Sequence, residues 1–355
     1  MNADEHYMSR CLQLATLGAG TVAPNPMVGA VLVYNGTIIG EGYHQKFGEA
    51  HAEINCLASV KEEDRKFIKN SVLYISLEPC AHFGKTPPCV DSIISNNIPH
   101  VVIACRDRFE AVNGKGVQKL LSAGIKVTEQ VLASQALQVN KRFFTFNEQK
   151  RPYVILKWAQ SKDGYIAATN AAPAKISNEI TDKLVHKWRS EEAAILVGTQ
   201  TALVDNPSLT TRLWMGKNPV RIVIDLNLRL PAHLKLFDGR SKTILINLLK
   251  DDQKPNLQWV KIDLSKPVLT SLLEALKNQG LSSLLVEGGA KLLQSFIQLG
   301  LWDEARVITN EALQLHSGLR APDLNNFRQF DEQKILSDKI QLFQNLSSIH
   351  HLGIF

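Results

Sequence analysis

The chain has little of what would place it outside ordinary globular proteins. Its five cysteines in 355 residues are too few, and odd in number, for a disulfide-rich scaffold. The longest apolar runs, such as residues 27–34, are far shorter than the roughly 18 residues that a membrane span needs. There is no internal repeat, no low-complexity tract and no signal-peptide pattern in the first ten residues. We therefore expect a cytoplasmic protein without membrane association, whose cysteines are buried, metal-bound or catalytic.

Length and charge favour two domains and a small ligand. At about 150 residues per domain, the length suggests two domains. The net charge is 40 − 34 = +6, of which 14 − 13 = +1 lies in residues 1–147 and 26 − 21 = +5 in the rest. This small excess suits a few phosphate contacts better than a nucleic-acid surface. We expect no nucleic-acid partner.

The first half predicts alternating helices and strands. Strands at residues 27–34 and 37–43 flank Asn35-Gly36, a pair typical of a tight hairpin turn. Further strands are expected at 72–77, 101–105 and 125–128, and helices at 4–17, 51–60, 90–95, 116–123 and 134–147. This alternation predicts a largely parallel sheet that is covered on both faces.

A polar segment, residues 147–152, interrupts the pattern and is expected to link two α/β domains, residues 1–147 and 151–355. After it, strands are expected at 154–158, 194–197, 220–224, 243–246 and 283–286, and helices at 180–190, 269–279 and 291–299. Residues 339–343 and 348–355 predict a closing pair of strands.

Three residues of the first half have the types and positions of zinc ligands. His51 opens a helix, Cys80 follows a buried strand, and Cys89 lies nine residues later near another helix start. One imidazole and two thiolates make a zinc site whose fourth position is open to water. Glu53, two residues from His51, is left to move protons, which is the arrangement of zinc-dependent nucleobase deaminases.

Two other interpretations stay open for these residues. Two cysteines nine residues apart are, on their own, more often buried apolar side chains. A fourth protein ligand would instead close the site and make it structural. The remaining cysteines lie in apolar periodic stretches typical of a core, and they are Cys11, Cys56 and Cys105.

Longer motifs in the first half resemble the bifunctional deaminase/reductase family of riboflavin biosynthesis. They are PNPMVGAV at 24–31, GEAHAE at 48–53 and PCAHFGKTPPC at 79–89. The resemblance implies a cytidine-deaminase-like three-layer domain that removes the 2-amino group of a diaminopyrimidine ribosylamino 5′-phosphate as ammonia. It also implies that Asn25, His44 and Lys85 line the substrate site. Residues 107–110 depart from the family, because they read DRFE instead of DPNP.

The second half lacks the Gly-x-Gly-x-x-Gly pattern of an ordinary Rossmann site. Instead, Gly288-Gly289 connect a buried strand to a helix. Glycines let a phosphate approach the backbone N–H groups of a helix N-terminus, although Gly-Gly is also an ordinary strand-to-helix turn.

Two further segments resemble the reductase half of the same family, KWAQSKDG at 157–164 and GTQTALVDNPSLTTR at 198–212. The resemblance implies a dihydrofolate-reductase-like α/β domain in which NADPH donates a hydride to C1 of the ribose. It implies NADPH contacts at Ala159, Thr201, Asp205 and Gly289, and substrate contacts at Arg189, Leu209, Arg212 and Glu287. A forked guanidinium suits a sugar phosphate, although Arg189 and Arg212 also stand at ordinary solvated positions. Pro173 and Lys175 stand where the family usually has Ser and Trp, so those two contacts are not implied.

A rival hypothesis is a deaminase of a nucleoside or nucleic-acid base with an inactive or nucleotide-sensing second domain. The near-neutral first half argues against a nucleic-acid substrate. We expect Zn²⁺ and NADPH as cofactors, a pyrimidine ribose phosphate as substrate, and a homo-oligomer.

Overall fold

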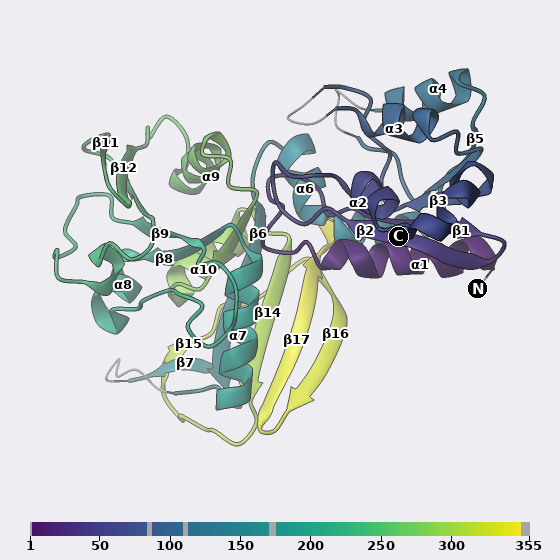
Figure 1. The fold of residues 1–355 in the computed structure, drawn as a ribbon. Coiled ribbons are helices and arrows are strands. Elements are labelled where there is room, and N and C mark those ends of the chain that lie inside the picture. Colours follow the sequence, from purple (N-terminus) through teal and green to yellow (C-terminus); the bar gives the residue numbers. More distant parts are fainter. Residues whose placement is uncertain (1, 84–86, 109–112, 170–174, 349–355) are drawn as a thin grey trace. The chain divides into compact units, whose positions relative to one another are not determined.

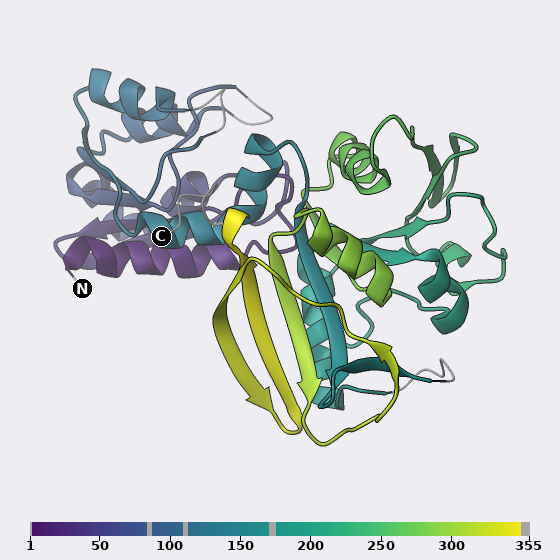
Figure 2. The same cartoon turned by 180° about the vertical axis from the view of Figure 1, so that it is seen from behind.

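The computed structural model describes residues 2–83, 87–108, 113–169 and 175–348. The chain divides into two compact units between Gln149 and Lys150. Figure 1 shows the layers of each unit, and Figure 2 shows them from behind. Within the described ranges, no helix has the length and apolar character that a membrane crossing requires.

The N-terminal unit is built on a five-stranded sheet of order β2-β1-β3-β4-β5. Its strands are β1 (Gly29–Tyr34), β2 (Thr37–Tyr43), β3 (Val72–Ile75), β4 (His100–Ile103) and β5 (Lys126–Thr128). The Asn35-Gly36 hairpin is confirmed, with both residues at positive φ and Tyr34 paired with Thr37. The prediction of a largely parallel sheet is wrong for this unit: β3, β4 and β5 are parallel, but β1 is antiparallel to β2 and to β3. The reason is that the tight hairpin returns the chain beside β1 without a crossover helix.

Helices cover both faces of this sheet, so the unit has three layers. They are α1 (Ala3–Thr16), α2 (Ala52–Ala58), η1 (Glu62–Asn70), α3 (Cys89–Ser95), α4 (Lys115–Ser122), α5 (Ala133–Val139) and α6 (Lys141–Glu148). Two glycines allow two of the helices to approach closely. A Cβ on Gly29 would lie 2.0 Å from Cys11 O of α1, and one on Gly42 would lie 2.2 Å from Cys56 N of α2.

The single helix expected at 134–147 is wrong, because the structure has two helices, α5 and α6, that meet at Asn140. The Asn140 side chain accepts a hydrogen bond from Met27 N (2.8 Å) and donates one to Met27 O (2.9 Å). Hydrogen bonds from an Asn side chain to backbone groups compete with the regular hydrogen bonding of a helix, and here they occur where α5 ends and α6 begins.

The C-terminal unit is built on a ten-stranded sheet of order β11-β12-β10-β9-β8-β13-β6-β14-β17-β16. The strands from β12 to β14 along this order are parallel, whereas β11, β17 and β16 are antiparallel to their neighbours. The strands are β6 (Tyr153–Ser161), β8 (Ala194–Gly198), β9 (Val220–Ile224), β10 (Thr243–Asn247), β11 (Asp252–Lys254), β12 (Leu257–Lys261), β13 (Ser283–Val286), β14 (Glu304–Asn310), β16 (Phe327–Ile335) and β17 (Asp338–Asn345), with a separate pair β7 (Tyr165–Ala168) and β15 (Gly318–Arg320).

Helices lie on both faces of this sheet as well. They are α7 (Glu179–Glu191), α8 (Thr199–Asp205), η2 (Lys235–Phe237), α9 (Val268–Asn278) and α10 (Ala290–Gln298). Trp188 of α7 packs in one cluster with Ile308 and Ile340, whereas Leu272 of α9 and Phe296 of α10 share another core. Figures 1 and 2 show α7 and α10 in front of the sheet in opposite views.

The expected closing pair of strands is only partly right. Residues 339–343 lie in β17, but its partner is β16, and residues 349–355 lie outside the described part of the chain. Ser348 belongs to a short helical turn. β16 was not anticipated because nearly all its residues are exposed, so it lacks the apolar alternation that predicts a strand.

Candidate active sites

The three expected zinc ligands come together in the N-terminal unit. His51 is the N-cap of α2, Cys80 follows β3, and Cys89 is the first residue of α3. His51 Nδ1 lies 3.3 Å from Cys89 Sγ and 3.6 Å from Cys80 Sγ, and all three ligand atoms lie within 4.8 Å of one another. Tetrahedral zinc, with bonds of about 2.0 Å to N and 2.3 Å to S, places neighbouring ligands roughly 3.5 Å apart. The donor types and their spacing therefore fit Zn²⁺.

The local electrostatics favour metal binding at Cys80. A hydrogen bond from the Cys89 side chain outweighs burial and, with His51 and the Cys89 N–H, lowers the pKa of Cys80 to about 4. The thiolate is the form that binds a metal. Glu53, in the first turn of α2, is only 3 % exposed, and burial raises its pKa.

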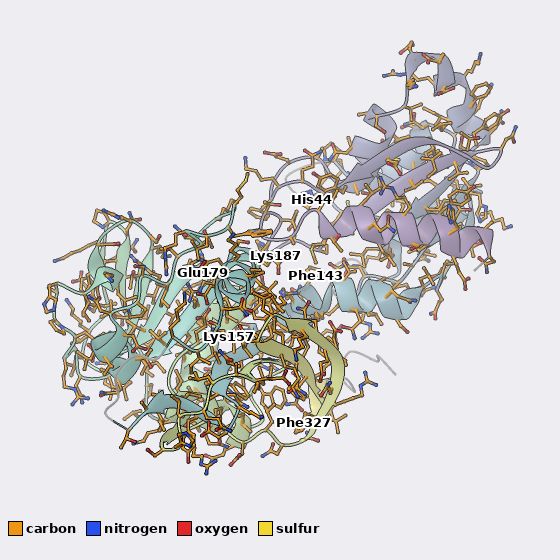
Figure 3. All side chains as sticks on the ribbon, turned by 90° about the horizontal axis from the view of Figure 1, so that it is seen from below. His44, Phe143, Lys157, Glu179, Lys187 and Phe327 are labelled. Atoms are coloured by element: carbon orange, nitrogen blue, oxygen red, sulfur yellow. The ribbon has the colours of Figure 1, made fainter. Side chains whose placement is uncertain are left out.

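His51, Glu53 and Cys80 line a pocket of about 360 Å³ together with Asn25 and His44. His44 Nδ1 lies 3.0 Å from the carbonyl of Ala50, which assigns the proton to Nδ1 and leaves Nε2 to accept from Asn25 Nδ2 at 3.3 Å. His44, marked in Figure 3, is buried, and this burial lowers its pKa. The structure thus brings two of the three expected substrate residues to the zinc ligands, and Lys85 lies outside the described residues.

In the C-terminal unit, two residues expected to contact substrate contact each other. Arg189 of α7 donates two hydrogen bonds to Glu287, Nε to Oε1 at 2.8 Å and Nη2 to Oε2 at 2.7 Å. Lys157 of β6, labelled in Figure 3, is half-buried, with Nζ 3.8 Å from Glu287 Oε2. Burial opposes ionisation of Glu287, but the two cations hold its pKa at about 2. Burial also lowers the pKa of Lys157.

The glycine turn after β13 contacts α8. Gly289 N donates a hydrogen bond to Thr201 Oγ1 at 2.9 Å. A Cβ on Gly288 would lie 2.7 Å from Val197 Cα, so only glycine fits against β8. Asp205 ends α8 and is exposed, and Ala159 is half-buried in β6. Thr201 and Gly289 are therefore adjacent, whereas Ala159 and Asp205 lie on other elements of the unit.

The remaining expected residues lie in different surroundings. Leu209 has a positive φ, and its side chain is buried in the core, so only its backbone is available to a substrate. Arg212 is exposed in the loop after it. Lys175 is exposed and lies 3.7 Å from Glu179, and Pro173 is outside the described residues.

Three polar residues near these sites, two of them buried, were given no role in the sequence analysis. They are the buried Glu78, the half-buried Lys157 and the buried His186, whose Nδ1 has no hydrogen-bond partner among the described residues. Burial and the charges of Arg189 and Arg212 lower the pKa of His186 to about 4. The sequence did offer signals for two of them: Lys157 lies inside an apolar strand, and Glu78 directly follows an apolar stretch.

Comparisons with known proteins agree with both halves. Residues 1–105 match the cytidine and deoxycytidylate deaminase zinc-binding region, and residues 152–313 match the RibD C-terminal domain. The chain is 38 % identical over 344 residues to the riboflavin biosynthesis protein RibD of Aquifex aeolicus, covering 95 % of each, and 35 % identical over 318 residues to that of Escherichia coli, covering 85 % and 86 %.

Solved structures agree as well. A diaminohydroxyphosphoribosylaminopyrimidine deaminase/5-amino-6-(5-phosphoribosylamino)uracil reductase from Thermotoga maritima superposes with a TM-score of 0.89 at 34 % identity, covering 97 % of this chain and 99 % of that one. RibD from Acinetobacter baumannii gives a TM-score of 0.87 at 29 % identity, covering 96 % and 98 %. This chain therefore belongs to the RibD family, the bifunctional deaminases and reductases of riboflavin biosynthesis.

Proposed function

We propose that residues 1–147 deaminate 2,5-diamino-6-(5-phosphoribosylamino)pyrimidin-4-one and that residues 151–355 then reduce its ribosyl group to ribityl with NADPH. The observation that carries the first step is the cluster of His51, Cys80 and Cys89, of which His51 and Cys80 line one pocket with the buried Glu53. The Thermotoga relative is a deaminase and reductase of this kind of substrate.

In the deaminase step, His51, Cys80 and Cys89 would hold Zn²⁺. When bound, Zn²⁺ supplies Lewis acidity that makes water a nucleophile near neutral pH. Glu53 takes a proton from the attacking water and gives it to the departing amine. A C–O bond forms at the pyrimidine carbon, the C–N bond breaks, and ammonia leaves. Asn25 and His44 orient the ring, and Lys85 contacts the substrate.

In the reductase step, bound NADPH would supply the hydride for C1 of the ribose, while the bond between C1 and the ring oxygen breaks and that oxygen takes a proton from water. Thr201 and Gly289 hold the turn where the helix N-terminus of α10 meets a phosphate. Ala159 and Asp205 complete the cofactor site. Glu287 orients Arg189, and this pair, with Arg212 and the backbone of Leu209, meets the sugar phosphate.

The rival hypothesis of an inactive second domain has no support, because the match to the RibD C-terminal domain covers residues 152–313. A closed structural zinc site would need a fourth protein ligand, and in the described part of the chain the metal cluster has three. We propose further that the protein is cytoplasmic, binds no nucleic acid and forms a homo-oligomer. The exposed edge strand β16 is a surface that supports self-association.

One experiment tests both steps. The diaminopyrimidine substrate is supplied with and without NADPH, while ammonia release and NADPH oxidation are followed separately. We expect ammonia in both conditions and NADPH oxidation only after deamination. Ammonia without any NADPH oxidation would contradict the reductase half, and no ammonia would contradict the deaminase half.

A further inference from the structure

The carboxylate of Glu78 is buried and accepts four backbone hydrogen bonds. Glu78 lies three residues after the end of β3. Oε2 accepts from Asp107 N at 3.2 Å and from Gly114 N at 3.0 Å. Oε1 accepts from Gly116 N at 2.9 Å and from Val117 N at 3.2 Å. The residue is 4 % exposed. Four N–H donors converging on two oxygens match an ionised carboxylate, which only accepts.

The four donors come from two separate stretches of chain. Asp107 follows β4, whereas Gly114, Gly116 and Val117 form the start of α4. Glu78 therefore joins the end of one strand to the beginning of the helix that follows it, on either side of residues 109–112. We call this set of contacts the Glu78 clamp.

Two glycines make the clamp possible. Gly114 has φ +82°, a conformation that favours glycine, and it precedes α4 as its N-cap. A Cβ on Gly116 would lie 2.1 Å from Pro79 O and 3.1 Å from Glu78 Oε1. The start of α4 is thus pressed directly against the Glu78-Pro79 backbone, which leads to Cys80.

The clamp belongs to the wall of the deaminase pocket. Glu78 and Asp107 line the same pocket as His51, Glu53 and Cys80. The carboxylate oxygens of Glu78 are occupied by backbone donors, so Glu78 is suited to holding the wall rather than to transferring protons. The backbone of Glu78 is held as well, because its N–H donates to Cys105 O at 3.0 Å.

We infer that Glu78 is a positioning residue of the deaminase, which keeps Asp107 and the start of α4 in place as one wall of the pocket beside Cys80. This inference rests on the proposed deaminase function. It predicts that loss of the carboxylate lowers kcat/KM for ammonia release by the zinc-loaded enzyme, because an amide presents an N–H₂ group to N–H donors that now bind a carboxylate oxygen.

The test is Glu78→Gln in the full chain, with Glu129→Gln as the matched control. Glu129 lies near the same loop, but its carboxylate accepts from the Arg106 side chain (2.6 and 2.8 Å) rather than from the backbone. Zinc content, kcat and KM for ammonia release, and reductase activity on the deaminated intermediate are measured on each sample. Amide hydrogen exchange is followed in peptides that contain Asp107 and Gly114.

We expect Glu78→Gln to lower kcat/KM for ammonia release per bound zinc by about tenfold or more, with a raised KM and faster exchange in both peptides. The reductase rate and the control variant should stay within about twofold of the wild type. An unchanged kcat/KM per bound zinc in Glu78→Gln would overturn the inference.

If Glu78→Gln holds no zinc, Glu78→Asp decides in its place, because it keeps the charge but withdraws the carboxylate by one methylene. A lowered kcat/KM per bound zinc in that variant supports the clamp, and a wild-type value overturns it. A wild-type chain that releases no ammonia would contradict the proposed function itself, which is a different outcome from an active wild type with an equally active variant.

Discussion

Arg189 and Glu287 form a partly buried ion pair with two hydrogen bonds, of 2.8 and 2.7 Å, between α7 and the turn after β13. The contact joins two segments almost one hundred residues apart and sits directly beside Gly288. The two hydrogen bonds hold the Arg189 guanidinium in one orientation. Removing only one partner of such a pair strongly destabilises the folded protein, because the remaining charge has no counter-charge.

Acid should weaken the C-terminal unit through Glu287. The folded pKa of about 2 lies below the unfolded value of 4.5, so the ionised form stabilises the fold above pH 4.5. That contribution, about 3 kcal/mol, is lost as the pH falls from 4.5 through 2. All five tryptophans of the chain lie in residues 158–302, so tryptophan fluorescence during urea unfolding reports this unit alone.

The control is Glu287→Gln, which cannot titrate. We expect it to be less stable at neutral pH by about 3 kcal/mol, since it leaves Lys157 and Arg189 without their counter-charge. It should also show a flatter dependence on pH between 4.5 and 2. Equal pH slopes in the two proteins would contradict this account of Glu287.

Glu53→Gln should slow deamination strongly while leaving the metal bound. Removing the proton carrier should lower kcat for ammonia release by about 10²–10⁴-fold, because proton transfer by a positioned side chain contributes that much. Zinc content is measured in the same sample. Undiminished ammonia release would refute the shuttle role, and an unchanged reductase rate on the deaminated intermediate is the internal control.

Zinc removal should separate the two activities. Dialysis against a chelator should end ammonia release and leave NADPH oxidation on the deaminated intermediate intact, and added Zn²⁺ should restore the first activity. Cys89→Ser should behave like the metal-free protein, whereas Cys105→Ala, at a buried cysteine outside the cluster, should keep its zinc. If Cys105→Ala lost zinc as Cys89→Ser does, the assigned ligand set would be wrong.

Gly288→Ala should destabilise the C-terminal unit, whereas Gly198→Ala should not. A Cβ at Gly288 would meet the backbone of Val197 at 2.7 Å and that of Gly198 at 2.8 Å, and backbone atoms cannot easily move aside. At Gly198 the nearest atom is Leu292 Cδ2 at 3.8 Å, an ordinary contact. We expect a loss of about 1–3 kcal/mol for Gly288→Ala in urea unfolding followed by tryptophan fluorescence. Equal stability of the two variants would contradict the close approach.

Local elements were predictable where one pattern dominated. The Asn35-Gly36 hairpin and helix α7 follow from turn chemistry and helical periodicity. The break at Asn140 was not predictable, because it depends on a hydrogen-bonded contact with Met27, 113 residues away. β16 was missed because an exposed edge strand has no apolar face to reveal it.

For the sites, the sequence by itself determined which chemistry is present: an imidazole and two thiolates at helix starts, a carboxylate two residues from the imidazole, and a Gly-Gly turn after a buried strand. These follow from residue type and local spacing. Only the tertiary structure decided that Glu78 collects four amides from two distant stretches, that Glu287 is paired with Arg189, and that the side chain of Leu209 faces the core. Such relationships depend on how strands are ordered in a sheet, which brings together residues whose separation along the chain carries no signal.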